Sequence, residues 1–258
     1  MTNPSAQPDK TKDRESAWAK PISTLKVSKL PSGAINLNVE GRHLTGPLQG
    51  FGQLWQKVYK IRLSGANATP QEVIKVWKNN FGNFWPKGNY FYSSLGEITA
   101  GDVAVLNIAG PLGITGPGGR PVVSTGVMVI YADDESFSFM TPDGHMFAAL
   151  ITFSAFEDEG TVAQIQVLIR ASDPIYELGC RLGIVHKTED DFWHKTLMNL
   201  ASYFDVEGYV QQTNTLVDPK IQWSEAKNIW NNAALRTGLY LLASPFRWVK
   251  NLGQTEKS

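Results

Sequence analysis

The chain has a single cysteine, Cys180, among its 258 residues. A disulfide within the chain and a zinc site built from cysteines are therefore excluded. Long hydrophobic runs are also missing, because the longest ones, at 127–132 and 146–151, are far shorter than a membrane span. The first twenty residues are polar and lack the apolar stretch of a secretion signal. We therefore expect a cytoplasmic, soluble protein.

Charge is scarce and balanced. Charged residues make up 19% of the chain, with 24 basic and 24 acidic side chains. Proteins that neutralise nucleic-acid phosphates usually carry a basic excess, so we expect no nucleic-acid partner. The neutral total results from two regions of opposite net charge. Residues 21–219 hold 14 basic and 19 acidic side chains, whereas residues 220–258 hold 6 basic and 2 acidic side chains. The sequence thus predicts an acidic body with a basic C-terminal tail.

Aromatic side chains are abundant, with 8 Trp, 8 Tyr and 12 Phe, and hydrophobic residues reach 42%. This is enough material for a sizeable core. Residues 51–63 alternate between apolar and polar positions, which predicts a half-buried strand with Trp55 and Tyr59 on one face. A helix is predicted to begin at Thr69, because Pro70 suits the first helical position and Glu72 completes a capping box.

Further along, the sequence predicts an antiparallel meander followed by a long helix. Short polar turns separate five apolar segments, at 102–109, 122–132, 136–140, 146–156 and 161–171. Thr188 is the expected cap of the last helix, with Glu189 and Asp190 in its first turn. This order predicts an α+β fold, in which a curved antiparallel sheet wraps around the helix and encloses an apolar cavity.

Three segments resemble the START-like (SRPBCC) superfamily and its helix-grip fold, in particular an uncharacterised branch found in bacteria and plants. They are FSFMTPDGHMFAALITF (137–153), VLIRASDP (167–174) and TEDDFW (188–193). The Gly144-His145 turn, Phe153 and the strand-end pattern at 170–174 match best. The chain departs from the family pattern where acidic residues are expected after this turn, because Leu150 and Ile151 stand there.

The resemblance implies an internal cavity for a lipid, sterol, polyketide or other apolar molecule, and in some members a cyclase, hydratase or oxygenase-subunit activity. The fold does not choose among these. The predicted organisation is a disordered leader (1–20), an N-terminal extension with a hairpin (21–46), a helix-grip domain (47–210), and a linker with an amphipathic helical tail (211–258).

His145 and Arg170 are the candidate chemical groups. His145 beside Asp143 is either a general acid or base at the cavity rim or, more simply, a turn histidine bonded to the backbone. Arg170 is either a catalytic or carboxylate-binding group or, more simply, a structural ion-pair partner of Asp173 and Glu177.

The sequence predicts neither a metal nor a cofactor. No two of His43, His145, His186 and His194 have the spacing of helical metal ligands. The glycine-rich loop at 110–121 lacks the Gly-Lys-Ser/Thr ending of a phosphate-binding loop and precedes a strand, so a cavity lid or a hairpin loop is expected instead.

A dense aromatic group is expected to fill the core and to place some of its rings at a cavity mouth. Its members are Trp77, Phe81, Phe84, Trp85, Tyr90, Phe91 and Tyr92. The predicted ligand-binding residues are Trp77, Phe84, Trp193 and Leu197.

The tail residues 221–243 have an amphipathic helical pattern. They are expected to pack on the body or on a second subunit, with docking on an anionic membrane as the alternative.

Three functions therefore stay open. The first is a binding protein for an apolar small molecule or lipid. The second is a cyclase- or hydratase-type enzyme of the same fold, with His145 as the first catalytic candidate. The third is an interaction protein recruited by its tail, through a peripheral membrane contact or a homodimer contact.

Overall fold

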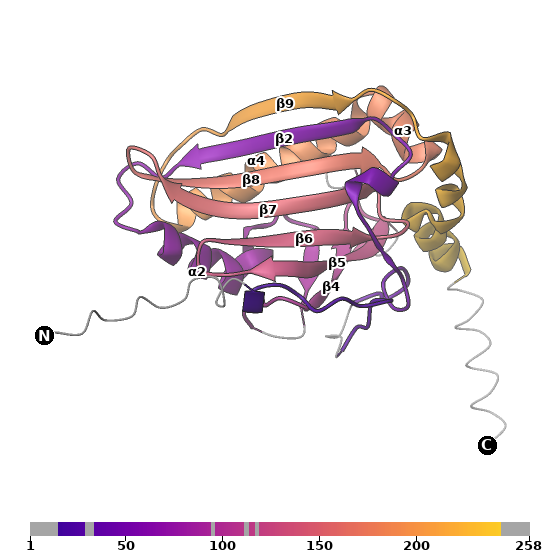
Figure 1. The fold of residues 1–258 in the computed structure, drawn as a ribbon, viewed down its shortest axis with the longest axis horizontal. Coiled ribbons are helices and arrows are strands. Elements are labelled where there is room, and N and C mark those ends of the chain that lie inside the picture. Colours follow the sequence, from indigo (N-terminus) through magenta and orange to yellow (C-terminus); the bar gives the residue numbers. More distant parts are fainter. Residues whose placement is uncertain (1–14, 29–33, 94–95, 111–113, 117–118, 244–258) are drawn as a thin grey trace, which may run out of the picture.

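A computed structural model describes residues 15–28, 34–93, 96–110, 114–116 and 119–243 (Figure 1). Most of the predicted leader, the centre of the predicted hairpin, part of the glycine-rich loop and the end of the tail, including the Phe246–Leu252 segment, lie outside these ranges.

Within the described residues, nine strands form one antiparallel sheet in the order β3-β4-β5-β6-β7-β8-β2-β9, with β1 paired to β6. The strands are β1 (Leu44–Thr45), β2 (Leu54–Arg62), β3 (Tyr90–Tyr92), β4 (Val103–Ile108), β5 (Val123–Ala132), β6 (Ser136–Pro142), β7 (Phe147–Glu157), β8 (Thr161–Ala171) and β9 (Gln211–Asp218). Consecutive strands from β4 to β8 pair as the predicted meander, and β3, which the sequence does not predict, adds to its edge beside β4.

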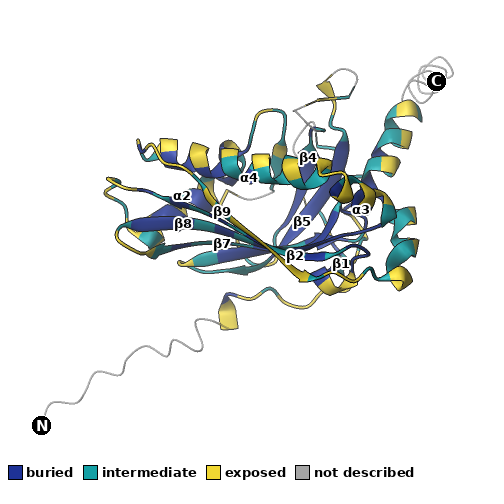
Figure 2. Ribbon diagram, turned by 90° about the horizontal axis from the view of Figure 1, so that it is seen from above, coloured by how far each residue is buried: buried dark blue, intermediate teal, exposed yellow. Residues whose placement is uncertain are grey.

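The helices are α2 (Pro70–Asn80), α3 (Pro174–Arg181), α4 (Ile184–Tyr203), the 3-10 helices η1 (Pro47–Gln49), η2 (Phe81–Phe84) and η5 (Trp223–Asn231), and a last helix at 233–243. Figure 2 shows α4 lying along one face of the sheet, with the N-terminal segment on the opposite face. The sheet curves around α4, which confirms the predicted α+β helix-grip fold.

The capping box that predicts α2 is present. The backbone N–H of Glu72 donates to the Thr69 hydroxyl, and the Glu72 carboxylate accepts from the Thr69 N–H at 2.8 Å. These contacts satisfy two N–H groups that have no partner within the helix, so α2 begins where the sequence predicts.

The predicted start of the last helix is wrong. α4 begins at Ile184, after Gly183 with its left-handed φ of +74°. Thr188 lies one turn inside the helix and donates its hydroxyl to the Ile184 carbonyl at 2.8 Å. A threonine inside a helix can bond the preceding turn in this way, so it does not mark a helix end.

The sequence also does not predict α3 or β9. Asp173 caps α3, because its carboxylate accepts from the N–H groups of Ile175 and Tyr176. The mostly polar, exposed β9 has no apolar alternation to reveal it, and its backbone pairs with β2 at the edge of the sheet.

The core forms on both faces of the sheet. The larger cluster lies between the sheet, α2 and α4, and includes the buried α4 residues Trp193, Leu197 and Leu200. A smaller cluster on the other face joins Leu25 and Val39 of the N-terminal segment to β4 and β5. The N-terminal segment thus covers the outer face of these strands.

The described part of the tail packs on the body. Gly144 has a φ of +85°, and a Cβ atom there would lie 2.0 Å from the Asn231 carbonyl oxygen. The Ala233 N–H donates to the Gly144 carbonyl at 2.8 Å, and Asn232 donates to the Asp173 carboxylate at 2.8 Å. Only glycine fits this turn, so the Gly144-His145 pair is the docking point of the tail.

None of the helices in the described ranges has the length and apolar character that crossing a lipid bilayer requires.

Candidate functional site

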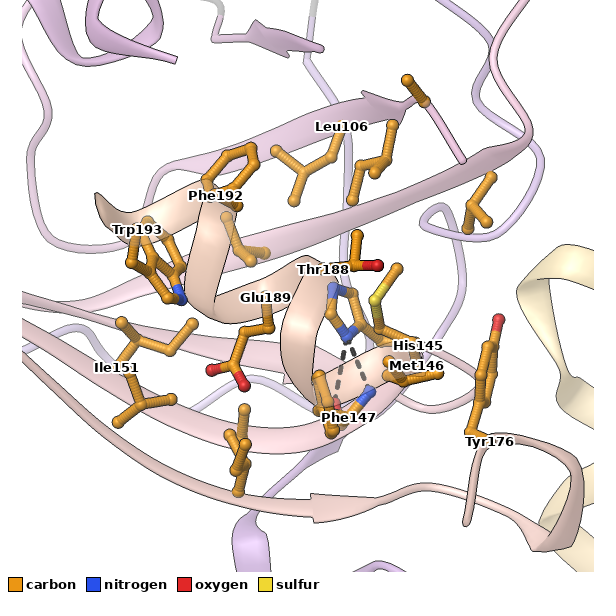
Figure 3. Close-up of a pocket in the computed structure, with 18 of the residues that line it drawn as sticks. Leu106, His145, Met146, Phe147, Ile151, Tyr176, Thr188, Glu189, Phe192 and Trp193 are labelled. Atoms are coloured by element: carbon orange, nitrogen blue, oxygen red, sulfur yellow. Dashed lines mark hydrogen bonds between the residues drawn. The ribbon is translucent and has the colours of Figure 1, made fainter. Parts of the chain in front are cut away.

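A cavity of about 290 Å³ lies between α4 and the inner face of the sheet (Figure 3). Its wall comes from η2, the strands β4 to β8, α3, α4 and one residue of the last helix. Apolar side chains dominate: Phe81, Trp85, Leu106, Ile108, Ala109, Val122, Val123, Val127, Phe139, Met146, Phe147, Ala149, Ile151, Val167, Ile169, Val185, Phe192, Trp193 and Ala234. A pocket of this kind binds ligands chiefly by burying apolar surface.

The distribution of small and aromatic side chains over the inner face of the sheet explains where the cavity lies. Toward α2, the inner face carries large rings in contact, with centroid distances of 5.3 Å for Trp77–Phe153 and 4.7 Å for Phe137–Phe153. The inner positions nearer α3 hold smaller residues, among them Ala149 and Val167. The cavity therefore lies where the inner face carries these smaller side chains.

Of the predicted ligand-binding residues, Trp193 lines the cavity. Trp77, Phe84 and Leu197 lie in the packed core instead, with side chains that are almost fully buried. From the predicted aromatic group, Phe81 and Trp85 line the cavity.

Four polar side chains also border the cavity: His145, Tyr176, Thr188 and Glu189. The Tyr176 hydroxyl accepts from the Ala234 N–H at 3.1 Å, and burial raises the pKa of Tyr176. This contact holds the last helix against the end of the cavity.

His145 is buried in the cavity wall, and the structure shows the backbone contacts of a turn histidine. Its Nδ1 lies 3.1 Å from both the N–H and the carbonyl of Phe147. Asp143, two positions earlier in the sequence, instead contacts Arg42 and Asn231. Burial lowers the pKa of His145 to about 4, although the bond to the Phe147 carbonyl opposes this shift. The imidazole is therefore neutral at pH 7.

The lowered pKa of His145 predicts a loss of stability in acid. Between pH 6.5 and 4 the unfolded chain takes up a proton that the folded protein does not, so the free energy of unfolding falls as the pH falls. The contribution reaches about 3 kcal/mol. Urea unfolding at a series of pH values should show a steeper slope for the wild type than for His145→Asn. The exposed His43→Asn control should keep the wild-type slope, and equal slopes for all three proteins would contradict the prediction.

A buried charge cluster lies beneath α4, next to the cavity. The Lys57 ammonium of β2 donates to Glu189 and to Asp190, both at 2.7 Å, and the Tyr59 hydroxyl donates to Asp190 at 2.6 Å. Burial opposes the charge of Lys57, but the two carboxylates outweigh it and raise the Lys57 pKa. Burial likewise opposes the charge of Asp190, and the bonds from Lys57 and Tyr59 outweigh it and lower the Asp190 pKa.

This cluster is the main feature that sequence reasoning missed. Lys57 has the same strand parity as Trp55 and Tyr59, so alternation alone places it on the inner face. A lysine at such a position is rarely buried unless it is paired. The parity of Lys57 therefore indicates a buried, paired lysine. It does not indicate the partners of this lysine, which lie more than 130 residues further along the chain.

His186 packs in the same region. Its ring stands 5.5 Å from the Trp55 ring and 6.1 Å from the Phe147 ring, and its Nδ1 is 4.0 Å from a Glu189 oxygen. That nitrogen is buried and has no hydrogen-bond partner among the described residues.

Arg170 lies on the outer face, away from the cavity. It forms an ion pair with Asp218 of β9 and donates to the backbone carbonyls of Gly52 and Lys220. The interpretation of Arg170 as a structural ion-pair partner is therefore confirmed. The partners predicted for Arg170 are wrong, because Asp173 caps α3 and Glu177 pairs with Arg181 at 2.8 Å.

Within the part of the chain that the structure describes, no group of three or more His, Cys, Asp or Glu side chains could hold a metal ion. Cys180 is buried, and this burial raises the pKa of its thiol. Since the thiolate is the reactive form, Cys180 is poorly suited to act as a nucleophile.

No protein-family model and no curated protein matches this sequence. Similar solved structures include the KanY protein (TM-score 0.40, 11% identity, 60% of this chain and 99% of that chain). A protein from Rhodobacter sphaeroides has a TM-score of 0.39 at 16% identity, over 62% of this chain and 97% of its own. The major latex-like protein 151 of Panax ginseng has a TM-score of 0.38 at 11% identity, over 59% and 99%. At these values, the helix-grip assignment rests on the sheet order and on α4 of this chain itself.

Proposed function

We propose that this protein binds an apolar small molecule or lipid in the cavity beneath α4. The observation that supports the proposal is the wall, in which 19 apolar side chains surround about 290 Å³. Transfer of apolar ligand surface into such a space contributes about 25 cal/mol per Å² before the costs of ordering.

The polar groups of the wall support binding more than catalysis. Tyr176 is engaged by the backbone of the last helix, and both contacts of His145 Nδ1 are to the backbone of Phe147. A general base usually needs a pKa near the working pH, whereas burial lowers the pKa of His145 to about 4. A hydratase or cyclase role for His145 is therefore the second candidate, supported only by its place in the cavity wall.

Native mass spectrometry of gently purified protein tests the proposal. We expect a reproducible adduct whose mass, after release by solvent, matches an apolar compound. Titration with the neutral apolar dye N-phenyl-1-naphthylamine should also change the fluorescence of Trp85 and Trp193, because both indoles line the cavity. Protein that carries no adduct and does not bind the dye would refute the function.

A further inference from the structure

The Glu189 carboxylate is the one acidic group on the cavity wall among the described residues. Only one of its two oxygens has a hydrogen-bond partner there. One oxygen accepts from Lys57 at 2.7 Å. The other, Oε1, is buried and has no hydrogen-bond partner within the described ranges. The Glu189 side chain is nine-tenths buried, and Figure 3 shows it extending from α4 toward the sheet. An unpaired buried carboxylate oxygen costs free energy that a donor from a ligand would recover.

The charge around Glu189 favours the same kind of partner. The cluster holds one cation, Lys57, and two carboxylates, Glu189 and Asp190. Lys57 has a raised pKa and Asp190 a lowered pKa, so this ion pair stays charged at pH 7. The formal charges of one lysine and two carboxylates sum to −1. Among the described residues that line the cavity there is no lysine or arginine.

We propose that the cavity selects apolar molecules whose head group donates a hydrogen bond, an amine or an alcohol, and discriminates against carboxylates. This inference rests on the proposed function and adds the chemistry of the ligand head group. The donor would bond Oε1 of Glu189 while the hydrocarbon part contacts the apolar wall. A carboxylate of the same chain length would meet Glu189 without a cation to pair with, in a setting where water screens charge poorly.

Three ten-carbon compounds that differ only in the head group test this: decylamine, decanol and decanoate. Each competes with N-phenyl-1-naphthylamine for the wild-type protein at pH 7. We expect decylamine and decanol to bind at least about tenfold more tightly than decanoate, a difference of about 1.4 kcal/mol. In Glu189→Gln the preference for decylamine over decanoate should shrink to about threefold or less, a change of roughly 0.7 kcal/mol.

Asp191→Asn is the matched control. It removes the same charge from the same helix, but Asp191 is half-exposed, pairs with Lys187 and does not line the cavity. The Asp191→Asn variant should keep the wild-type preference for decylamine over decanoate.

Equal binding of decanoate and decylamine to the wild type would overturn the head-group inference and leave the apolar binding function standing. If the dye binds but none of the three compounds displaces it, the head-group inference fails, whereas the apolar binding function fails only if the protein carries no adduct and does not bind the dye. Should Glu189→Gln not fold, the ranking on the wild type alone decides.

Discussion

Ala149→Phe is expected to abolish most ligand binding while leaving the protein folded. Ala149 lies on β7 opposite Ile169 of β8, is buried, and lines the cavity. A phenyl ring at this position would occupy the space beneath α4. If it removes about 100 Å² of apolar contact from the ligand, binding weakens by about 2.5 kcal/mol, or roughly 70-fold.

The stability cost of Ala149→Phe should be small for a core substitution. Adding a ring to a filled core usually costs about 1–3 kcal/mol, because side chains and backbone must shift. Here the ring enters an existing cavity and gains apolar contacts, so we expect the cost to lie below that range. Urea unfolding measures this cost, and dye titration of the same sample measures binding.

Leu150→Phe is the control for this prediction. Leu150 neighbours Ala149 on β7, but the strand alternation turns its side chain to the outer face, and it does not line the cavity. It should bind the dye and the co-purified compound as the wild type does. A folded Ala149→Phe protein that binds with wild-type affinity would place the ligand outside the cavity.

The parts of the fold that the sequence predicts are those specified by close neighbours. The start of α2 depends on Thr69, Pro70 and Glu72, which lie within four positions. The inner face of β8 follows from simple alternation, in which Ile165, Val167 and Ile169 are all buried. The same local reasoning gives the wrong start for α4, because Thr188 satisfies its hydroxyl inside the helix.

The sequence predicts a cavity between the sheet and the last helix, but not its position along that helix, because this position depends on which part of the sheet the aromatic rings fill. Trp77 and Phe84 have the expected size and apolar character, but their rings pack in the core. Composition gives the number of rings, whereas the register of β6, β7 and β8 decides which of them meet. Trp193, another predicted ligand-binding residue, borders the cavity.

The charge cluster also depends on contacts between segments that lie far apart in the sequence. Lys57 lies on an inner strand position, which the sequence reveals, and Glu189 and Asp190 were predicted in the first turn of a helix. α4 begins four residues before Thr188, so these carboxylates lie one turn further inside it, where both bond the lysine. Neither segment by itself indicates this pairing.

Lys57→Met should be the most destabilising substitution considered for this protein. Lys57 is almost fully buried and is bonded to two carboxylates at 2.7 Å. Removing it leaves Glu189 and Asp190 as neighbouring negative charges beneath α4 with no cation between them. Breaking a buried ion pair by removing one partner typically costs about 3–5 kcal/mol. We expect a loss of this size at pH 7, measured by urea unfolding.

The pH dependence identifies the cause of this loss. Without Lys57, burial and mutual repulsion raise the carboxylate pKa values in the folded protein above those in the unfolded chain. The unpaired charges then cost most above these pKa values, and the penalty fades as the carboxylates take up protons in acid. The difference in stability between wild type and Lys57→Met should therefore be largest at neutral pH and should shrink toward pH 4.

Two further variants separate charge from packing. Lys60→Met, on the opposite face of β2, removes a lysine that contacts only the Phe156 ring at 5.6 Å among the described aromatic groups, and it should cost less than about 1 kcal/mol. Combining Lys57→Met with Glu189→Gln and Asp190→Asn removes all three charges and should recover much of the lost stability, since neutral buried groups need no counter-charge. A single Lys57→Met variant as stable as the wild type at pH 7 would show that the cluster contributes nothing to the fold. If the triple variant were no more stable than the single one, the lysine would act through its hydrocarbon packing instead.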